Sequence, residues 1–292
     1  MGAVKPQIVK FLCGVVFESQ QNLQQFNTCN GWNCATITES RDLRGTRISG
    51  VSGISGVYIL AKKQFFAICD TETTIADTVA DFAIIIVDRD GTIHNQCAVI
   101  IAHEFNTHAL FFDGKIAEGL WSKSYALYKR DNYNRMLESG QRMSASVAAV
   151  NRWINQAIGK YNPTLTAYNL AFDKSKCVNT GIELSGFNSE FCLWQAAVGN
   201  ICKTKKYKQF ALDNHLFGNV TKFGNMTFKT TAESVCGYIR GEFTDEPHTA
   251  LEDARDFELP ILRSIICKDK WRDKITPYNW RDFQVKDNFV AK

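Results

Sequence analysis

Three apolar runs follow one another in the first third of the chain, at residues 64–70, 80–88 and 92–102. The first is continuously apolar and ends in an acid, a pattern typical of a strand buried on both faces. The Asp90-Gly91 pair between the second and third runs favours a tight hairpin turn. We therefore expect these runs to form three strands of an antiparallel meander.

The apolar period then changes to that of a helix. Apolar residues recur at the spacing of one helix face at Val147, Val150, Ile154 and Ile158. Pro163 ends this helix. Short apolar runs follow at 165–172 and 191–198, and residues 205–216 and 250–266 have helical patterns. Strands first, then alternating helices and strands, predict a mixed α/β domain whose later strands are parallel.

The chain divides by composition into two parts. Residues 1–56 are rich in Gln and Asn and end in evenly spaced glycines, which predicts an N-terminal extension with a flexible joint. Residues 57–292 form the predicted folded domain, with a basic and aromatic C-terminal tail. Hydrophobic residues make up 45% of the sequence, enough for a packed core, and disorder is not expected.

Charge and cysteine usage exclude several classes of protein. The net charge of +4 is too small for a histone-like electrostatic binder, so nucleic-acid contacts would need local basic patches. No apolar stretch has the length that a membrane span requires. The ten cysteines are irregularly spaced, which favours a reducing compartment, and we expect a soluble cytoplasmic protein. Cys13, Cys29 and Cys34 offer a weak zinc pattern, and buried or incidental thiols are the alternative.

Two acids close the first predicted strand. Asp70 and Glu72 are two positions apart, so their side chains point to the same face of a strand. Two neighbouring carboxylates repel each other unless a cation lies between them, and oxygen-rich sites suit magnesium or manganese. The structural alternative is a solvated strand end with ordinary surface acids.

A further acid, Asp173, follows the apolar run at 165–172. This is where a strand passes into a helix, a common location for functional residues in α/β folds. The structural alternative for this residue is a helix N-cap.

The segment 247–254 combines a histidine with an acid. Thr249 and Glu252 have the spacing of a capping box, which predicts a helix that begins at residue 250. Asp253 then lies in the first helical turn, and His248 lies on the loop before it. The alternative is a histidine that only caps or packs.

Taken together, these segments resemble the three motifs of the DEDD superfamily of DnaQ-like 3′→5′ exonucleases. The resemblance is carried, in chain order, by CDTET, AYNLAFD and HTALEDA, and it covers residues 63–267. A histidine five residues before the last acid is similar to the histidine subclass. The tyrosine subclass would have a tyrosine where Thr249 stands. The sequence is most similar in texture to members encoded by bacteriophages.

The resemblance implies a fold and a set of ligands. It implies a ribonuclease H-like fold, with a five-stranded mixed sheet flanked by helices. It implies two divalent cations, Mg²⁺ or Mn²⁺, on Asp70, Glu72, Asp173 and Asp253. Asp70 would bridge both ions, Glu72 and Asp253 would hold the ion that activates water, and Asp173 would help to hold the second. His248 would be the general base.

The implied activity is metal-dependent hydrolysis of single-stranded DNA or RNA from the 3′ end to 5′-mononucleotides. The positions expected to contact substrate are Thr71, Thr73, Asn169 and Phe172. The site of action would be the cytoplasm, or the host cytoplasm for a phage-encoded protein. The choice between DNA and RNA, a standalone or proofreading role, and the oligomeric state stay open.

Two other functions stay open. One is a catalytically silent nucleic-acid binding module on the same fold. The other is a phosphatase of the haloacid dehalogenase type, because Asp70 to Thr74 is similar to its Asp-x-Asp-x-Thr loop, although Glu72 stands where that loop has aspartate. Basic residues interleaved with aromatics suit single-stranded nucleic acid. They occur here as Lys203, Lys205, Lys206 and Lys208 with Tyr207, and as Lys268, Lys270, Arg272, Lys274 and Arg281 with Trp271, Tyr278 and Trp280. The structural alternative is a solvated surface helix and tail.

Overall fold

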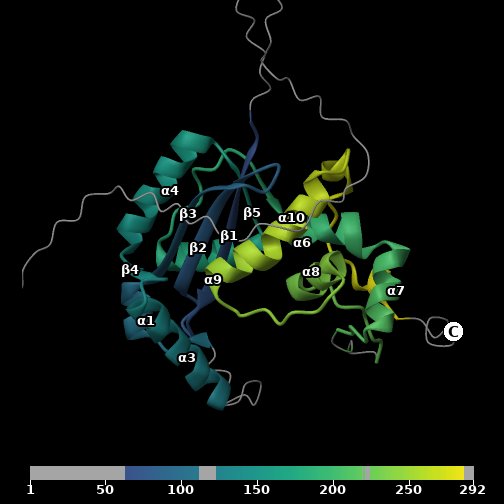
Figure 1. The fold of residues 1–292 in the computed structure, drawn as a ribbon, viewed down its shortest axis with the longest axis horizontal. Coiled ribbons are helices and arrows are strands. Elements are labelled where there is room, and N and C mark those ends of the chain that lie inside the picture. The colour runs from purple at the N-terminus through teal and green to yellow at the C-terminus, as the bar shows by residue number, and fades with distance from the viewer. Residues whose placement is uncertain (1–62, 112–122, 219, 221–223, 286–292) are drawn as a thin grey trace, which may run out of the picture. The chain divides into compact units, whose positions relative to one another are not determined.

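The computed structural model describes residues 63–111, 123–218, 220 and 224–285 (Figure 1). The predicted N-terminal extension, residues 1–56, lies outside the described residues. Cys13, Cys29 and Cys34 belong to it, so the weak zinc pattern stays a prediction.

The first three strands form the predicted meander. Strand β1 (Phe65–Thr73) pairs antiparallel with β2 (Val79–Asp88), which pairs antiparallel with β3 (Ile93–Ile101). Gly91 in the β2–β3 turn has φ +84°, a backbone angle that glycine adopts without strain. The hairpin expected from the Asp-Gly pair is therefore confirmed.

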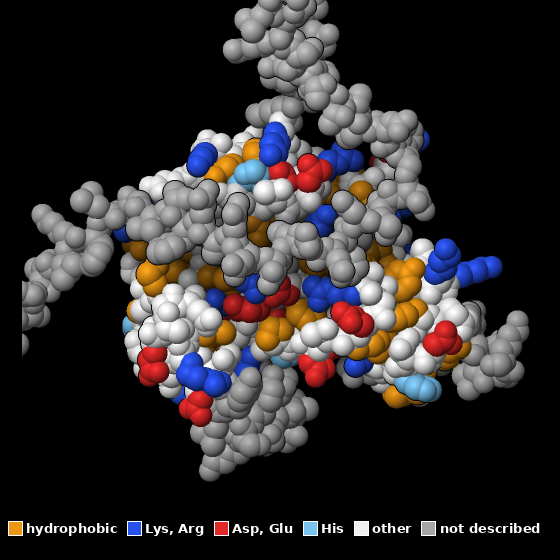
Figure 2. Space-filling model, in the orientation of Figure 1, with side chains coloured by type: hydrophobic (Ala, Val, Ile, Leu, Met, Phe, Trp, Pro, Cys, Tyr) orange, Lys and Arg blue, Asp and Glu red, His pale blue; other side chains and the backbone are white. Residues whose placement is uncertain are grey.

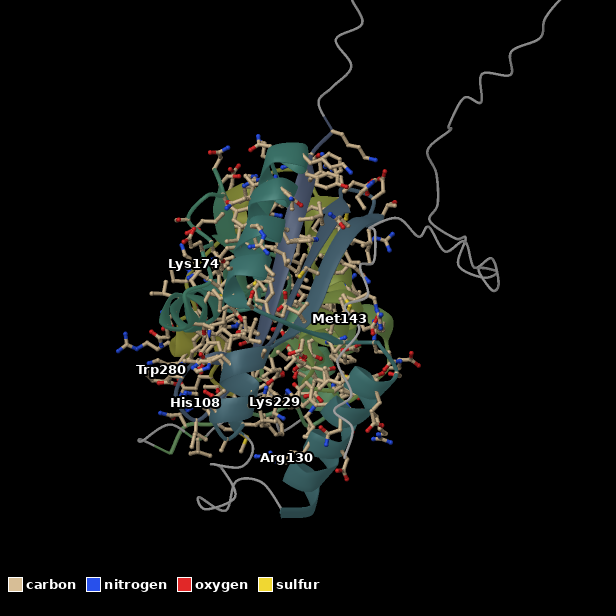
Figure 3. The ribbon with its side chains drawn as sticks, turned by 90° about the vertical axis from the view of Figure 1, so that its left-hand side faces the viewer. His108, Arg130, Met143, Lys174, Lys229 and Trp280 are labelled. Carbon is tan, nitrogen blue, oxygen red and sulfur yellow. The ribbon has the colours of Figure 1, made fainter. Side chains whose placement is uncertain are left out.

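Three short strands complete a mixed sheet. Strand β5 (Thr164–Ala167) is parallel to β1, β6 (Glu190–Cys192) is parallel to β5, and β4 (Met143–Ala145) is parallel to β3. The strand order is β4-β3-β2-β1-β5-β6. The sheet thus has six strands, and the expected number of five is wrong. The sequence gives no apolar run at β4, because it is an edge strand of three residues and the Met143 side chain is 67% exposed (Figure 3).

Helices cover both faces of the sheet. In chain order they are α1 (Ala102–Thr107), α3 (Lys123–Glu138), α4 (Val147–Tyr161), α5 (Leu170–Thr180), α6 (Leu193–Ala197), the π-helix η1 (Val198–Cys202), α7 (Lys205–Asp213), α8 (Ala232–Arg240), α9 (Ala250–Glu252), the π-helix η2 (Asp253–Glu258), α10 (Leu259–Ile266), and the 3₁₀ helices η3 (Trp271–Lys274) and η4 (Trp280–Phe283). The helices expected near 147–158, 205–216 and 250–266 are all present.

Alternate residues of β1 belong to two separate cores. Phe66 and Ile68 pack with residues of α6, α8 and α10 on one face of the sheet. Ala67 and Cys69 pack with residues of α4 and α5 on the other face. Figure 1 shows α8 and α10 on the opposite side of the strands from α4. Since side chains alternate along a strand, the next even-numbered positions, Asp70 and Glu72, face the C-terminal helices.

Candidate active site

Strand β1 supplies two carboxylates at its carboxyl end. Asp70 and Glu72 are half-buried and lie on the same face of the strand as the fully buried Phe66 and Ile68. The pairing of β1 with β2 shifts register between Glu72 and Thr73, so the strand is irregular directly after the second acid. The two-residue spacing thus brings both carboxylates to one face, as the sequence predicts.

Asp173 comes from the turn between β5 and α5. Asn169 joins the two elements in a left-handed conformation, with φ +77°, and α5 begins at the next residue. Asp173 lies in the first turn of α5 and is 2% exposed. The hydroxyl of Thr71 donates a 2.8 Å hydrogen bond to Asp173 Oδ1. This bond ties α5 to β1 and fixes the third carboxylate beside the first two.

The loop before α9 holds His248 in an uncommon backbone conformation. His248 has φ +53°, in the left-handed region. Lys129 of α3 donates hydrogen bonds to the main-chain carbonyls of Pro247 and His248, the latter at 2.8 Å. The Lys129 side chain is buried, at 1% exposure. A buried ammonium group therefore ties this loop to α3.

Helix α9 begins at Ala250, as predicted, but the capping contact differs. The Thr249 hydroxyl donates to Glu252 Oε2 at 2.7 Å and accepts no helix N–H. The Ala250 N–H instead donates to Asp81 Oδ2 of β2 at 3.0 Å. Arg142 pairs with both acids, with Nε 3.1 Å from Asp81 Oδ1 and Nη2 2.5 Å from Glu252 Oε2. The helix start is thus anchored to the sheet by a buried aspartate far away in the sequence.

The π-helix η2 begins at Asp253 and ends at Glu258. In a regular α-helix each residue advances about 100°, so positions five apart diverge by about 140°. A π-helical turn, closed by an i→i+5 hydrogen bond, brings such positions back to nearly one side. Both carboxylates line the same cavity. Wide turns of this kind are frequent at functional sites.

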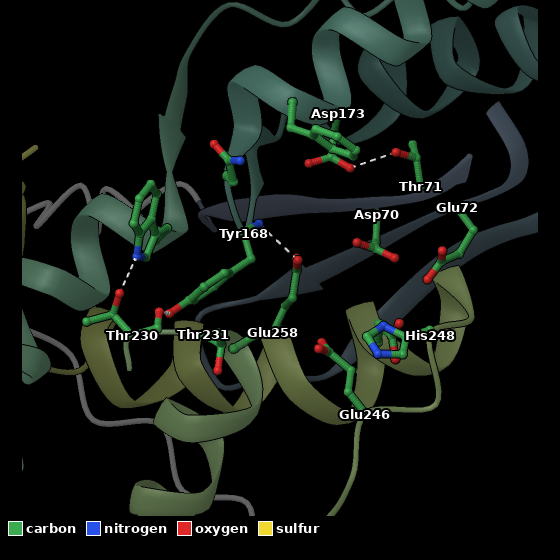
Figure 4. A pocket seen from close by; sticks show the side chains of 15 residues that line it. Asp70, Thr71, Glu72, Tyr168, Asp173, Thr230, Thr231, Glu246, His248 and Glu258 are labelled. Atoms are coloured by element: carbon green, nitrogen blue, oxygen red, sulfur yellow. Dashed lines mark hydrogen bonds between the residues drawn. The ribbon is translucent and has the colours of Figure 1, made fainter. Parts of the chain in front are cut away.

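These segments enclose a cavity of about 350 Å³ (Figure 4). Six carboxylates line it: Asp70, Glu72, Asp173, Glu246, Asp253 and Glu258. The other lining residues are Thr71, Tyr168, Asn169, Phe172, Trp194, Thr230, Thr231, Ala232 and His248. The five predicted catalytic positions therefore converge on one cavity from three separate segments.

Burial and mutual repulsion keep these acids from ionising easily. Burial raises the pKa of Asp173 to about 7. Burial, followed by repulsion from Glu246 and Glu72, raises the pKa of Asp253 to about 10. The pKa values of Asp70 and Glu72 are also raised well above the usual range, first by burial. Ionised carboxylates that are buried and close together are destabilised, and a cation bound between them offsets this cost.

The donor atoms fit a divalent cation. Glu72, His248 and Asp253 each offer one ligand atom, and these atoms lie within 4.8 Å of one another. Asp253 Oδ1 and Glu258 Oε2 are buried and have no hydrogen-bond partner among the described residues. The carboxylate oxygens suit Mg²⁺ or Mn²⁺, whereas an imidazole nitrogen is more typical of zinc or iron sites. The cluster within 4.8 Å includes His248 beside two of the four acids expected to hold metal.

His248 is poised as a neutral imidazole. Burial lowers its pKa below the usual value, and the positive charge of Lys129 lowers it further. A neutral imidazole has a lone pair with which to accept a proton at neutral pH. The side chain is half-buried and lines the cavity. It faces the carboxylates from the opposite wall to β1 (Figure 4).

Three of the four expected substrate positions line the cavity. They are Thr71, Asn169 and Phe172, and the Phe172 ring is 43% exposed. Thr73 does not line it. This residue is 7% exposed and follows the register shift in β1.

Several lining residues were not expected from the sequence. The Tyr168 hydroxyl donates to the Thr230 carbonyl at 2.5 Å, and the Trp194 Nε1–H donates to the Thr230 hydroxyl at 3.0 Å. Glu246 and Glu258 add two carboxylates. Tyr168 lies within the motif AYNLAFD and Glu258 lies four residues after HTALEDA, which is the one signal that points to them. Trp194 and Thr230 come from separate segments and carry no motif.

The basic clusters differ from the interleaved pattern expected for stacking on bases. Tyr207 is fully buried and Trp271 is 8% exposed, so neither ring is open to a base. Lys203 pairs with Asp282 at 2.9 Å. Among the described side chains visible in Figure 2, acidic and basic groups are interleaved. The expected stacking role is therefore wrong for Tyr207 and Trp271.

Comparison of the chain with protein-family models and with curated proteins finds no match. Within the described part of the chain, no helix combines the length and the apolar character needed to cross a membrane.

Proposed function

We propose that this protein is a metal-dependent 3′→5′ exonuclease that releases 5′-mononucleotides from single-stranded nucleic acid. One observation carries the proposal: three distant segments contribute Asp70, Glu72, Asp173, Asp253 and His248 to a single cavity. Each segment alone has an ordinary structural explanation. Their convergence on one cavity, in the arrangement that the motifs imply, has no such ordinary explanation. The direction of digestion is taken from the resemblance to the DEDD superfamily.

The four predicted acids would hold two divalent cations, Mg²⁺ or Mn²⁺. When bound, these cations would offset the charge of the phosphodiester and stabilise both the attacking and the leaving oxygen. The support for this ligand set is the buried, repelling state of the carboxylates and the unpartnered Oδ1 of Asp253.

His248 would accept the proton of the attacking water. Its ring nitrogen lies within 4.8 Å of oxygens of Glu72 and Asp253, so it is next to the acids expected to bind the cation. Its lowered pKa keeps it unprotonated at neutral pH. A positioned general base of this kind contributes typically about 10²–10⁴-fold in rate.

The aromatic side chains of the cavity would receive the terminal nucleoside. Tyr168, Phe172 and Trp194 all line the cavity. Bases of any sequence stack on aromatic rings, with about 1–3 kcal/mol per base. A cavity that combines carboxylates with aromatic walls suits one nucleotide of a single strand.

The sheet supports assignment to the ribonuclease H-like fold. A meander of three antiparallel strands is followed by β5 and β6, which run parallel to β1. Strand β4 would be an addition at the edge. Asp70 lies within a strand and not in a loop after it, which favours the exonuclease over the dehalogenase-type phosphatase.

The test is digestion of single-stranded DNA and RNA labelled at either end, with the products sized. The wild-type chain with Mg²⁺ or Mn²⁺ is expected to release mononucleotides from 3′ ends, and EDTA is expected to abolish release. Asp70→Asn is expected to bind the oligonucleotide but to release nothing. Binding without cleavage by the wild-type chain would support a silent module instead. Cleavage of small phosphate esters alone would support the phosphatase.

A further inference from the structure

Glu258 is a buried carboxylate with one hydrogen-bonded oxygen and one oxygen that has no hydrogen-bond partner among the described residues. Its side chain is 2% exposed and lines the cavity. Oε1 accepts a 2.9 Å hydrogen bond from the Tyr168 N–H. Oε2 is buried and has no hydrogen-bond partner among the described residues. A single bond therefore orients the carboxylate and leaves its second oxygen available inside the cavity.

The surroundings of Glu258 are acidic. After burial, repulsion from Glu258 is the largest cause of the raised pKa of Asp70. After burial, repulsion from Asp173 is the largest cause of the raised pKa of Glu258 itself. Figure 4 shows the Glu258 carboxylate between the Tyr168 main chain, to which it is hydrogen-bonded, and Asp70. A buried, incompletely bonded carboxylate beside two others is costly unless a cation compensates it.

The wide turn of η2 places Glu258 in this position. Asp253 is the first residue of this π-helix and Glu258 is the last, and both line the cavity. In a regular α-helix these two positions would diverge by about 140°. The π-helical turn therefore adds a second carboxylate from the same helix to the site, on the side of Asp70 and Asp173.

We propose that Glu258 is a fifth carboxylate of the metal site, sharing with Asp70 and Asp173 the cation farther from His248. This inference rests on the proposed metal-dependent function. Glu72, His248 and Asp253 surround one position. Asp70, Asp173 and Glu258 line the same cavity, and each of these carboxylates is close enough to the other two to repel them. Glu258 thereby raises the negative charge at the second position, which increases its affinity for a divalent ion.

The test is titration of the metal-free full-length chain with Mn²⁺ by calorimetry, with thermal unfolding of the same samples. The key variant is Glu258→Gln, whose amide carbonyl can still accept the bond from the Tyr168 N–H. In this variant, the affinity of the weaker of the two Mn²⁺ sites is expected to fall about tenfold or more. The metal-free variant is expected to unfold at the same or a higher temperature than wild type, because a repulsive charge is gone. The increase in Tm on addition of Mn²⁺ is expected to shrink.

Two controls separate the possible outcomes. The exposed Glu183→Gln removes a charge outside the cavity and is expected to leave the isotherm unchanged. Glu258→Asp keeps the charge but shortens the side chain, so its Mn²⁺ affinity is expected to lie between the wild-type and Glu258→Gln values. If Asp70→Asn weakens Mn²⁺ binding and Glu258→Gln does not, Glu258 is no ligand and the proposed function stands. Absence of Mn²⁺ binding by the wild-type chain would overturn the metal-dependent function itself.

Discussion

The ammonium group of Lys129 donates a 2.8 Å hydrogen bond to the main-chain carbonyl of His248, from a position 119 residues earlier in the chain. It also bonds the carbonyl of Pro247. The same charge favours ionisation of Glu72 and Asp253, while it lowers the pKa of His248. Lys129 thus fixes the loop of the proposed base and tunes its protonation from outside the three motifs.

Replacement of Lys129 by methionine is expected to lower kcat about 10–100-fold, because the His248 loop loses its anchor. The acid limb of the pH–rate profile is expected to move to higher pH, since a positive charge near His248 is removed. Mn²⁺ affinity is expected to hold or rise, because Glu72 and Asp253 lose a competing cation. Steady-state kinetics across pH and Mn²⁺ titration measure these effects. The exposed Lys160→Met is the matched control, and a wild-type profile in Lys129→Met would refute the positioning role.

Substitution of His248 by asparagine tests the general base. Turnover at neutral pH is expected to fall about 10²–10⁴-fold. Mn²⁺ affinity is expected to change little if the ring acts on water and not on metal. Single-turnover rates and Mn²⁺ calorimetry on the same preparation decide between the two roles. A large loss of Mn²⁺ affinity would make His248 a metal ligand, as its closeness to Glu72 and Asp253 also permits.

The metal-free protein is expected to lose stability as pH rises from 5 to 8. Burial raises the pKa of Asp173 and of Glu246 to about 7, above the value of about 3.9–4.3 in an unfolded chain. A raised pKa contributes stability that is complete below the unfolded value and is lost as pH rises through the folded value. Each group contributes a slope of up to about 1.4 kcal/mol per pH unit.

Chemical unfolding in EDTA at several pH values measures this slope. Asp173→Asn is expected to flatten it, and saturating Mn²⁺ is expected to reduce it by compensating the carboxylates. Glu252 has a lowered pKa, and its contribution is lost only as pH falls, outside this window. Equal slopes for wild type and Asp173→Asn would show that Asp173 is not the buried acid described above.

The sequence predicted those parts of the site that depend on local pattern. The i, i+2 spacing of Asp70 and Glu72 determines their common face whatever surrounds the strand. The position of Asp173 follows from the strand–helix boundary before it. Tertiary contacts could not be predicted in this way. The sequence predicted that Thr249 and Glu252 would cap α9, but Asp81 provides the cap because the sheet brings it there.

The remaining features depend on geometry that no local pattern encodes. Glu258 reaches the cavity because the helix widens to a π-turn, whereas a regular 3.6-residue period would place it elsewhere. Lys129 belongs to a helix whose partner loop lies far along the chain. Strand β4 is too short and too exposed to give an apolar run. Burial of Tyr207 likewise follows from packing of α7, and its basic neighbours gave the opposite indication.

The buried ion pair between Arg142 and Asp81 provides a test of how the start of helix α9, directly before Asp253, is held against the sheet. Both side chains are fully buried, with Arg142 Nε 3.1 Å from Asp81 Oδ1, and Asp81 also accepts the Ala250 N–H. Arg142→Met leaves Asp81 buried without its counter-charge and is expected to cost about 3–5 kcal/mol of unfolding free energy. Chemical denaturation measures this cost. The double variant Asp81→Asn/Arg142→Met removes both charges while keeping an acceptor for Ala250, and it is expected to recover much of the loss.

The exposed pair Lys174–Glu190 is the control, since Lys174→Met should change stability by less than about 1 kcal/mol. An Arg142→Met effect as small as that of Lys174→Met would mean that this buried pair does not anchor the helix.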